Sequence, residues 1–151
     1  FIDDLSGLYN RKYMNHYLDK LQNDNPKRVY GFLMDINDFK TINDIYGHLK
    51  GDQAIIQFGK ILQHSIDKDS VAIRMGGDEF VIFAILKSNE EALALKKHIE
   101  QNVRQFNTNS TEPFHLSFSI GIAKYSGNIE TFLSSMDDSM YEAKNMHRLM
   151  H

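Results

Sequence analysis

The chain has 151 residues, the usual length of one domain, and a formal net charge of −3 from 17 basic and 20 acidic side chains. That balance argues against a protein that coats nucleic acid nonspecifically, because such proteins carry a basic excess. Cysteine is absent, which excludes disulfides, thiolate metal sites and a cysteine nucleophile. No apolar run approaches the roughly 20 residues that span a bilayer.

The composition of 42% hydrophobic and 25% charged residues is typical of a folded chain. No repeat, low-complexity tract or long linker divides the sequence, so we interpret residues 1–151 as one domain. Because the sequence begins at Phe1 and not at Met, we expect this domain to come from a longer protein.

Apolar spacing predicts helices and strands along the chain. The first helix follows Asn10, a candidate N-cap, and Gly76-Gly77 suits a tight turn between two strands. The order predicts an α/β fold (an α+β sandwich) with helices flanking a mixed central sheet of about five strands. The predicted elements are a helix with Met14, Leu18 and Leu21, a strand at Val29 to Met34, a helix with Ile55, Phe58, Leu62 and Ile66, strands at Val71 to Met75 and Phe80 to Leu86, a helix from Ser88 to Phe106, a strand at Leu116 to Ile120 and a helix from Ile129 to Ala143.

Three carboxylates lie where such a fold does not require them. Asp35 ends an apolar strand, and ligand sites of open α/β sheets lie beyond that edge, although the residue could also cap a turn. Asp78 and Glu79 follow the glycine pair at a hairpin tip, where a solvated turn is the alternative. Together the three offer oxygen ligands for Mg²⁺ or Mn²⁺, which usually shares its coordination shell with substrate phosphates.

The segment from Asp38 to Asp52 is rich in polar and glycine residues and is predicted to be a loop that presents backbone N–H groups to phosphates. Asn43 and Asp52 suit the acceptor and donor edge of guanine, but Asp52 could equally cap the helix that begins near Gln53. Lys144 and Arg148 share one helix face, either as a solvated basic edge or as a clamp on a triphosphate.

Five motifs in this order resemble the GGDEF family, the diguanylate cyclase domains of bacterial signalling proteins. The central motif is Gly76-Gly77-Asp78-Glu79-Phe80, preceded by Arg74. The other four matching segments are Asp4 to Arg11, Asp35 to Asp52, Ser117 to Ile122 and Asp137 to Lys144.

The resemblance implies a fold like that of nucleotidyl cyclases and the polymerase palm. It implies condensation of two GTP molecules into cyclic di-GMP with release of pyrophosphate, by attack of a 3′-hydroxyl on an α-phosphate across a homodimer, with two Mg²⁺ (or Mn²⁺) ions per active site. It also implies a cytoplasmic domain with an upstream sensor or neighbouring output domain, without nucleic acid or membrane contact of its own, in a protein that other segments could anchor to a membrane. The alternative is a catalytically weak GTP-binding module that regulates an attached phosphodiesterase or other output domain.

Site roles carry over from the family residue by residue. Asp78 and Glu79 are expected at the reacting centre, and the turn glycines Gly76 and Gly77 beside the nucleotide. The remaining expected roles are metal binding by Asp35, Ile36, Asp78 and Glu79, guanine binding by Asn43 and Asp52, and phosphate binding by Asp38, Phe39, Lys40, Lys144 and Arg148.

The sequence departs from the family at several positions. Asp67 and Ser70 replace the Arg-x-x-Asp motif of the product-inhibition site, so we expect that site and its feedback inhibition to be absent. Asn37 stands where many members have Asp, which weakens the local negative charge. His147 replaces the usual glycine beside Arg148, and we expect it to crowd that residue.

Overall fold

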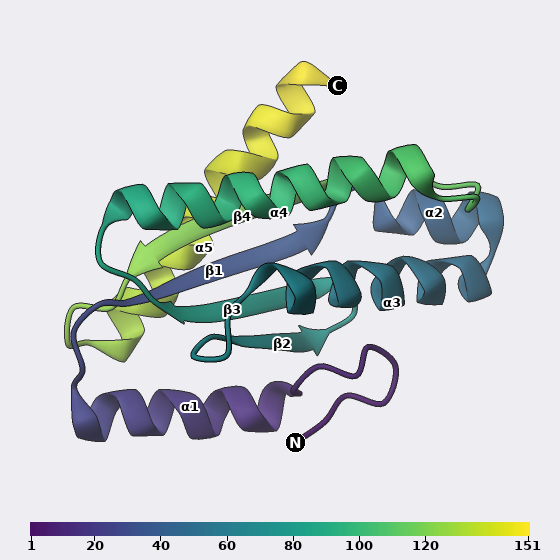
Figure 1. Ribbon diagram of the computed structural model, residues 1–151. Coiled ribbons are helices and arrows are strands. Elements are labelled where there is room, and N and C mark those ends of the chain that lie inside the picture. Colours follow the sequence, from purple (N-terminus) through teal and green to yellow (C-terminus); the bar gives the residue numbers. More distant parts are fainter.

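The computed structural model describes residues 1–151 and consists of five helices and four strands (Figure 1). The helices cover both faces of a single sheet, and the C-terminal turns of the last helix project beyond it (Figure 1). The elements in chain order are α1 (Arg11–Asp24), β1 (Val29–Ile36), α2 (Phe39–Tyr46), α3 (His48–Ser65), β2 (Val71–Gly76), β3 (Glu79–Ile85), α4 (Asn89–Asn109), β4 (Phe118–Lys124) and α5 (Ile129–Met150).

The sheet has the order β2-β3-β1-β4, and each neighbouring pair is antiparallel. The expected mixed sheet of about five strands is therefore corrected to four strands without a parallel pair. The strands β1 and β2 run in the same direction, but they do not pair with each other. Instead β3 lies between them and pairs with both in the antiparallel sense. This β-α-β-β-α-β connectivity is a split βαβ arrangement, and it makes β1 a central strand.

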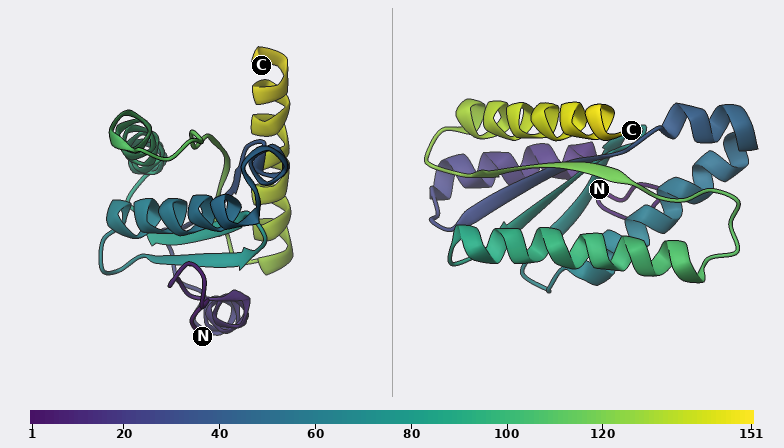
Figure 2. Two further views of the ribbon diagram at one scale, coloured as in Figure 1. Left: turned by 90° about the vertical axis from the view of Figure 1, so that its right-hand side faces the viewer. Right: turned by 90° about the horizontal axis from the view of Figure 1, so that it is seen from above.

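All residues of β1 are buried because helices cover both faces of the sheet. Phe32 and Met34 belong to the core beneath α3 and α4, whereas Val29 and Leu33 belong to the core beneath α1 and α5 (Figure 2). A strand that is buried on both faces needs no polar alternation, which explains its continuous apolar run.

Local capping and turn chemistry confirm several predicted element boundaries. Asn10 caps α1 by accepting a hydrogen bond from the Tyr13 N–H at 3.1 Å. Ser88 caps α4 in the same way, with the Glu91 N–H as donor. Gly76, the last residue of β2, and Gly77, which follows it in the turn, have φ values of 144° and 54°. Residues with a side chain rarely adopt such positive φ values.

The segment from Asp38 to Asp52 is helical, so its prediction as a loop was wrong. Most of it forms α2 and the start of α3, which are separated only at Gly47 with φ 89°. The helical pattern was hard to detect because α2 is short and Ile42 is its one buried residue. The later strand also begins further along the chain than predicted, at Phe118 instead of Leu116.

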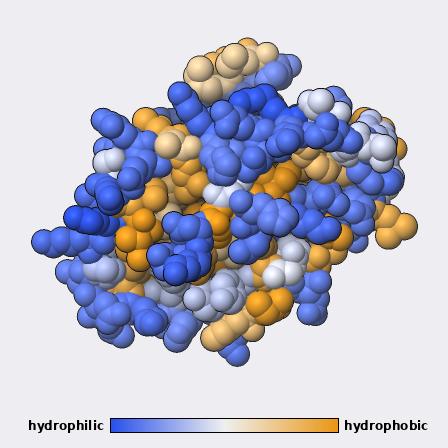
Figure 3. Space-filling model, viewed as in Figure 1, coloured by the Kyte–Doolittle hydropathy of each residue, from blue (hydrophilic) through white to orange (hydrophobic).

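The surface seen from the side of Figure 1 is mostly hydrophilic, with separate hydrophobic areas (Figure 3). One of these areas is the projecting end of α5, where Met146, Leu149 and Met150 are exposed. No helix combines the length and the apolar character needed to cross a membrane.

Close packing of α5 on the sheet depends on Gly121 in β4. A Cβ atom at this position would lie 2.3 Å from the Met140 backbone nitrogen and 2.4 Å from the Met136 carbonyl oxygen. At Gly31 in β1, a Cβ atom would instead meet side chains, the Met136 sulfur at 2.5 Å and the Phe132 ring at 2.7 Å. Backbone cannot yield as a side chain can, so Gly121 sets how closely the helix approaches the sheet.

We expect Gly121→Ala to lower the free energy of unfolding by about 2 to 3 kcal/mol, because the methyl group overpacks against helix backbone. Gly31→Ala is the matched control and should cost less, about 1 kcal/mol, since the side chains of Met136 and Phe132 can shift where helix backbone cannot. Urea denaturation of both variants and the wild type measures the difference. Equal losses in the two variants would contradict the account.

Candidate active site

Asp35 lies at the end of the central strand and is only 4% exposed. One carboxylate oxygen, Oδ2, forms an ion pair with Lys144 from α5. The other oxygen, Oδ1, is buried and accepts no hydrogen bond. A buried carboxylate is costly unless its charge and its lone pairs are matched, so the free oxygen indicates a missing partner.

A cavity of about 350 Å³ opens around this carboxylate. It brings together the end of β1, the first residues of α2, the β2–β3 hairpin and the last turns of α5. Eight of the predicted site residues line it, together with Asn37 and His147. The eight are Asp35, Ile36, Asp38, Phe39, Lys40, Asp78, Lys144 and Arg148.

The β2–β3 hairpin brings its two acidic residues to Asp35 in different ways. The Ile36 N–H donates to the Asp78 carbonyl oxygen at 3.3 Å, which fixes the hairpin tip against β1. Asp78 is half-buried and lines the cavity. Glu79 is exposed and lies outside the cavity lining, although it pairs directly with Asp35 across the two strands. Directly paired residues project from the same face of a sheet.

The environment of Asp78 disfavours its charged form. Burial is the main cause that raises the pKa of Asp78, and the negative charge of Asp35 adds to it. The N–H of its own backbone, Lys144 and Arg74 act in the opposite direction but do not cancel the increase. Two neighbouring carboxylates thus share one cavity, as expected where a cation completes a site.

The donor set of the cavity fits a hard divalent cation. Its potential ligands are all oxygens, from the carboxylates of Asp35 and Asp78 and the carbonyl of Ile36, and the Asp35 Oδ1 atom lacks a partner. No three carboxylate or histidine side chains lie close enough to hold an ion without other ligands. That shortfall suits Mg²⁺, which keeps several waters and substrate oxygens beside one or two carboxylates.

The N-terminus of α2 is suited to binding an anion. Asp38 has a left-handed backbone with φ 57°, and its side chain does not cap the helix. The first-turn N–H groups of Phe39 and Lys40 therefore remain without an intrahelical acceptor beside the cavity. The Lys40 side chain points away, since it is 92% exposed and forms an ion pair with Asp44 at 3.5 Å.

Asn37, which departs from the family's usual Asp, links the end of β1 to β4. Its side-chain N–H donates to the Ser117 hydroxyl at 2.9 Å, and its oxygen accepts from the Ser119 hydroxyl at 2.7 Å. A carboxylate at this position would lack the N–H donor, but it could accept hydrogen bonds from both hydroxyls, because serine can donate as well as accept. These two bonds therefore link the strand ends without requiring the amide.

The predicted guanine-binding residues lie away from this cavity, on α2 and α3. Asn43 lies against Gly51, where a Cβ atom would be 1.8 Å from the Asn43 side-chain oxygen. The absence of a side chain at Gly51 thus allows the two helices to meet, with Asn43 packed against the residue that precedes the exposed Asp52. Asp52 does not cap α3, which already begins at His48, so its capping alternative is wrong.

Arg74 and Asp3 form a contact, not predicted from the sequence, that holds the hairpin against the N-terminal segment; we call it the Asp3–Arg74 brace. Arg74 donates through Nε to the Gly77 carbonyl at 3.0 Å and forms an ion pair with Asp3 at 3.1 Å. Burial alone would raise the pKa of Asp3, but hydrogen bonds from Ser6 and the Arg74 charge outweigh it and lower the pKa. The available signal was the opposite charges of Asp3, one residue before the first motif, and Arg74, two residues before the glycine pair.

Asp67 and Ser70, at the positions of the expected inhibition motif, bond to each other. The Asp67 carboxylate accepts hydrogen bonds from the Ser70 hydroxyl and from the Asp69 N–H, both at 3.0 Å. These bonds close the turn between α3 and β2.

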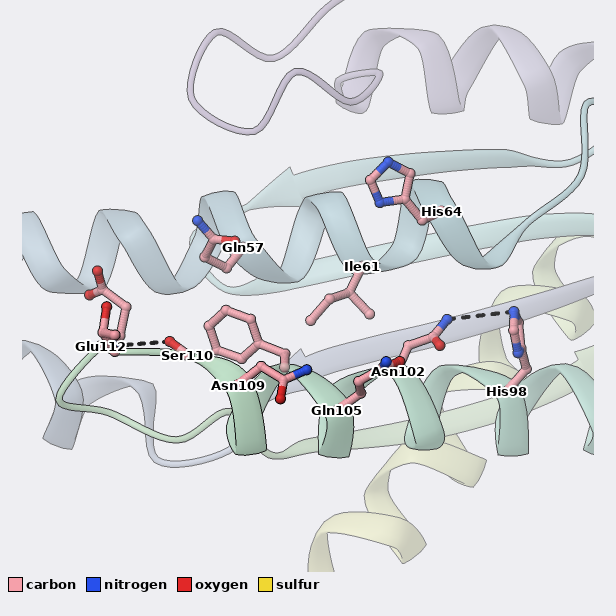
Figure 4. Close-up of a pocket in the computed structure, with 11 residues that line it drawn as sticks. Gln57, Ile61, His64, His98, Asn102, Gln105, Asn109, Ser110 and Glu112 are labelled. Carbon is pink, nitrogen blue, oxygen red and sulfur yellow. Dashed lines mark hydrogen bonds between the residues drawn. The ribbon is translucent and has the colours of Figure 1, made fainter.

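A larger cavity, of about 690 Å³, lies between α3 and α4, away from all of these residues (Figure 4). Amide and histidine side chains dominate its lining, and Asn102 donates from its wall to the Ser65 hydroxyl at 2.8 Å. Its one carboxylate, Glu112, forms an ion pair with Lys50 at 3.0 Å. Without lysine, arginine or paired carboxylates, this groove lacks the chemistry for a metal–triphosphate complex.

We expect Asp78→Asn to raise the stability of the protein near neutral pH. The raised pKa means that the folded state holds the Asp78 proton more tightly than the unfolded state, so ionisation costs stability above the folded pKa. The gain should shrink as the pH falls below the unfolded value, where the wild type is neutral in both states. Urea midpoints at several pH values measure this.

Asp19→Asn, on the exposed face of α1, is the control and should leave the midpoint nearly unchanged. A loss of stability in Asp78→Asn at neutral pH would show that the carboxylate is not under electrostatic strain.

The chain is similar to known proteins along almost its whole length. The family model described as "Diguanylate cyclase, GGDEF domain" matches residues 1–149. The diguanylate cyclase DgcM of Escherichia coli is 32% identical over 148 residues, which cover 95% of this chain and 36% of the relative. The diguanylate cyclase DgcS of Shewanella oneidensis is 36% identical over 151 residues, which cover 94% and 49%. The chain thus spans less than half the length of these curated relatives.

Solved structures agree with the family match. The GGDEF domain of TpbB (YfiN) from Pseudomonas aeruginosa has a TM-score of 0.84 at 28% identity, covering 97% of this chain and 90% of that chain. The diguanylate cyclase SiaD of Pseudomonas aeruginosa, solved with its activator SiaC, has a TM-score of 0.86 at 21% identity, covering 96% and 58%, and shows the shared fold. From the whole-length family match and this structural agreement, the chain belongs to the GGDEF family.

Proposed function

We propose that this domain is a diguanylate cyclase, which condenses two GTP molecules into cyclic di-GMP and releases pyrophosphate. The single observation that carries the proposal is the buried Asp35 carboxylate, with one unpartnered oxygen, in a cavity that Asp78 and Lys144 also line. Relatives that bear this activity in their names support the choice of reaction.

The polyphosphate chain of GTP would be held by three groups around the cavity. These are the free N–H groups at the start of α2, the Lys144 ammonium and the Arg148 guanidinium. Lys144 pairs with Asp35 in the structure, so nucleotide binding requires Lys144 to turn from the carboxylate to the phosphates. When Lys144 moves to the phosphates, both carboxylate oxygens of Asp35 would become available to other ligands.

Diguanylate cyclases of this family are metal-dependent, and Asp35, Asp78, Glu79 and the Ile36 carbonyl would hold Mg²⁺ or Mn²⁺ here, two ions per site. The metal supplies positive charge that stabilises the oxygens of the reacting phosphate. Asp78 would serve either as one of these ligands or as the base toward the 3′-hydroxyl, since it lines the cavity beside Asp35. The bond that forms joins this oxygen to the α-phosphorus, and the bond that breaks releases pyrophosphate.

Asn43 and Asp52 would bind the guanine base. The amide supplies a donor and an acceptor, and the carboxylate supplies acceptors, which together match the guanine O6, N1 and N2 positions. Gly76 and Gly77 lack side chains at the exposed hairpin tip, so the nucleotide can approach the backbone there.

The reaction needs two nucleotides, whereas the domain has a single cavity in which Asp35 and Asp78 lie beside Lys144 and Arg148. We therefore propose that two copies face each other, each holding one GTP. A sensor or output domain elsewhere in the full-length protein would control their approach, and the domain would act in the cytoplasm.

We expect cyclic di-GMP to form when concentrated protein is incubated with GTP and Mg²⁺, since a weak dimer requires high concentration. Glu79→Gln should reduce product formation by about 100-fold or more, because it removes a charge from the reacting centre. The matched control is Glu90→Gln in the first turn of α4, which should leave the rate unchanged. Chromatography of the nucleotide products measures both.

Binding of GTP by a proven dimer without any cyclic di-GMP would contradict catalysis. In that case the regulatory GTP-binding module would be the better account, and GTP-dependent stimulation of an attached output domain would test it.

A further inference from the structure

His147 is a cavity residue to which the proposed mechanism gives no task. It lies on α5 between Lys144 and Arg148, and its side chain is 20% exposed. It lines the same cavity as both cations. The ring is therefore at the phosphate end of the site and not on the outer face of the helix.

The contacts of His147 give its ring a defined direction. Its Nε2 atom lies 3.5 Å from the Asp38 carboxylate oxygen Oδ2, at the entry to α2. Its other neighbour is the His151 ring, with centroids 4.5 Å apart. The Asp38 carboxylate is 72% exposed, so it can turn into water when a stronger anion arrives.

The cavity is short of available positive charge. Lys40 points to solvent beside Asp44. Even after Lys144 turns from Asp35 to the phosphates, Lys144 and Arg148 are the only permanent cations of the lining that can meet the nucleotide. A nucleoside triphosphate with several negative charges would favour an additional cation at this place, and a protonated imidazole provides one.

We propose that His147 is a third phosphate-binding side chain, which donates from its ring to the nucleotide in the protonated form. This inference rests on the proposed nucleotide site. Imidazole changes its charge between about pH 5 and pH 8, so the affinity for nucleotide falls as the pH rises through that interval. The charged or titratable groups around the ring are Asp38 before α2 and His151 after α5, which contact it, and Asp35, Asp78, Lys144 and Arg148, which line the same cavity.

The test is the affinity of the wild type and His147→Gln for a non-hydrolysable GTP analogue with Mg²⁺, measured by calorimetry from about pH 6 to about pH 8. The terminal phosphate of the nucleotide also loses a proton in this interval, so the readout is the ratio of the two affinities. We expect the wild-type advantage to be about 5- to 10-fold at the acidic end and to vanish at the alkaline end.

Two further variants make the outcome specific. His147→Arg carries a permanent charge and should bind more tightly than the wild type at the alkaline end. His115→Gln, on the exposed segment before β4, should reproduce the wild-type profile. Thermal unfolding of all variants checks that each is folded at every pH.

Equal pH profiles for the wild type and His147→Gln, with binding intact in both, would overturn the role of His147 and leave the proposed function standing. Absence of analogue binding by every variant, the wild type included, would overturn both.

Discussion

The structure depends on one costly placement, a carboxylate buried at the end of its central strand. Helices on both faces and strands on both sides remove Asp35 from water. Lys144 matches one oxygen, and the other has no partner. An incompletely matched buried charge reduces stability, and folds retain such features mainly where function requires them.

The β2–β3 hairpin and α5 converge on this carboxylate, and specific contacts hold each of them in place. The hairpin is held by the Ile36–Asp78 bond and by Arg74, which itself is anchored to Asp3. The α5 helix is brought close to the sheet at Gly121, so that Lys144 reaches the strand end. Lys144, which neutralises Asp35 in the structure, would instead pair with the phosphates of a bound nucleotide.

Much of the fold could be predicted from sequence because burial and capping act locally. The cap at Asn10, the glycine turn and the buried strand were all confirmed. Strand order could not be predicted, since insertion of β3 between β1 and β2 is a long-range choice that apolar spacing does not encode. The grouping of Asp35 with Asp78 was predicted from residue chemistry and the place of Lys144 only from the family resemblance, whereas α2 and the Asp3–Arg74 brace depend on contacts between distant segments.

The most direct test of the central claim is anomalous scattering from Mn²⁺ in crystals of the domain grown with a non-hydrolysable GTP analogue. We predict a manganese peak bonded to the Asp35 carboxylate, with the Lys144 ammonium moved from Asp35 to the phosphates. A bound nucleotide without metal at Asp35, or with the Lys144–Asp35 ion pair unchanged, would contradict the account.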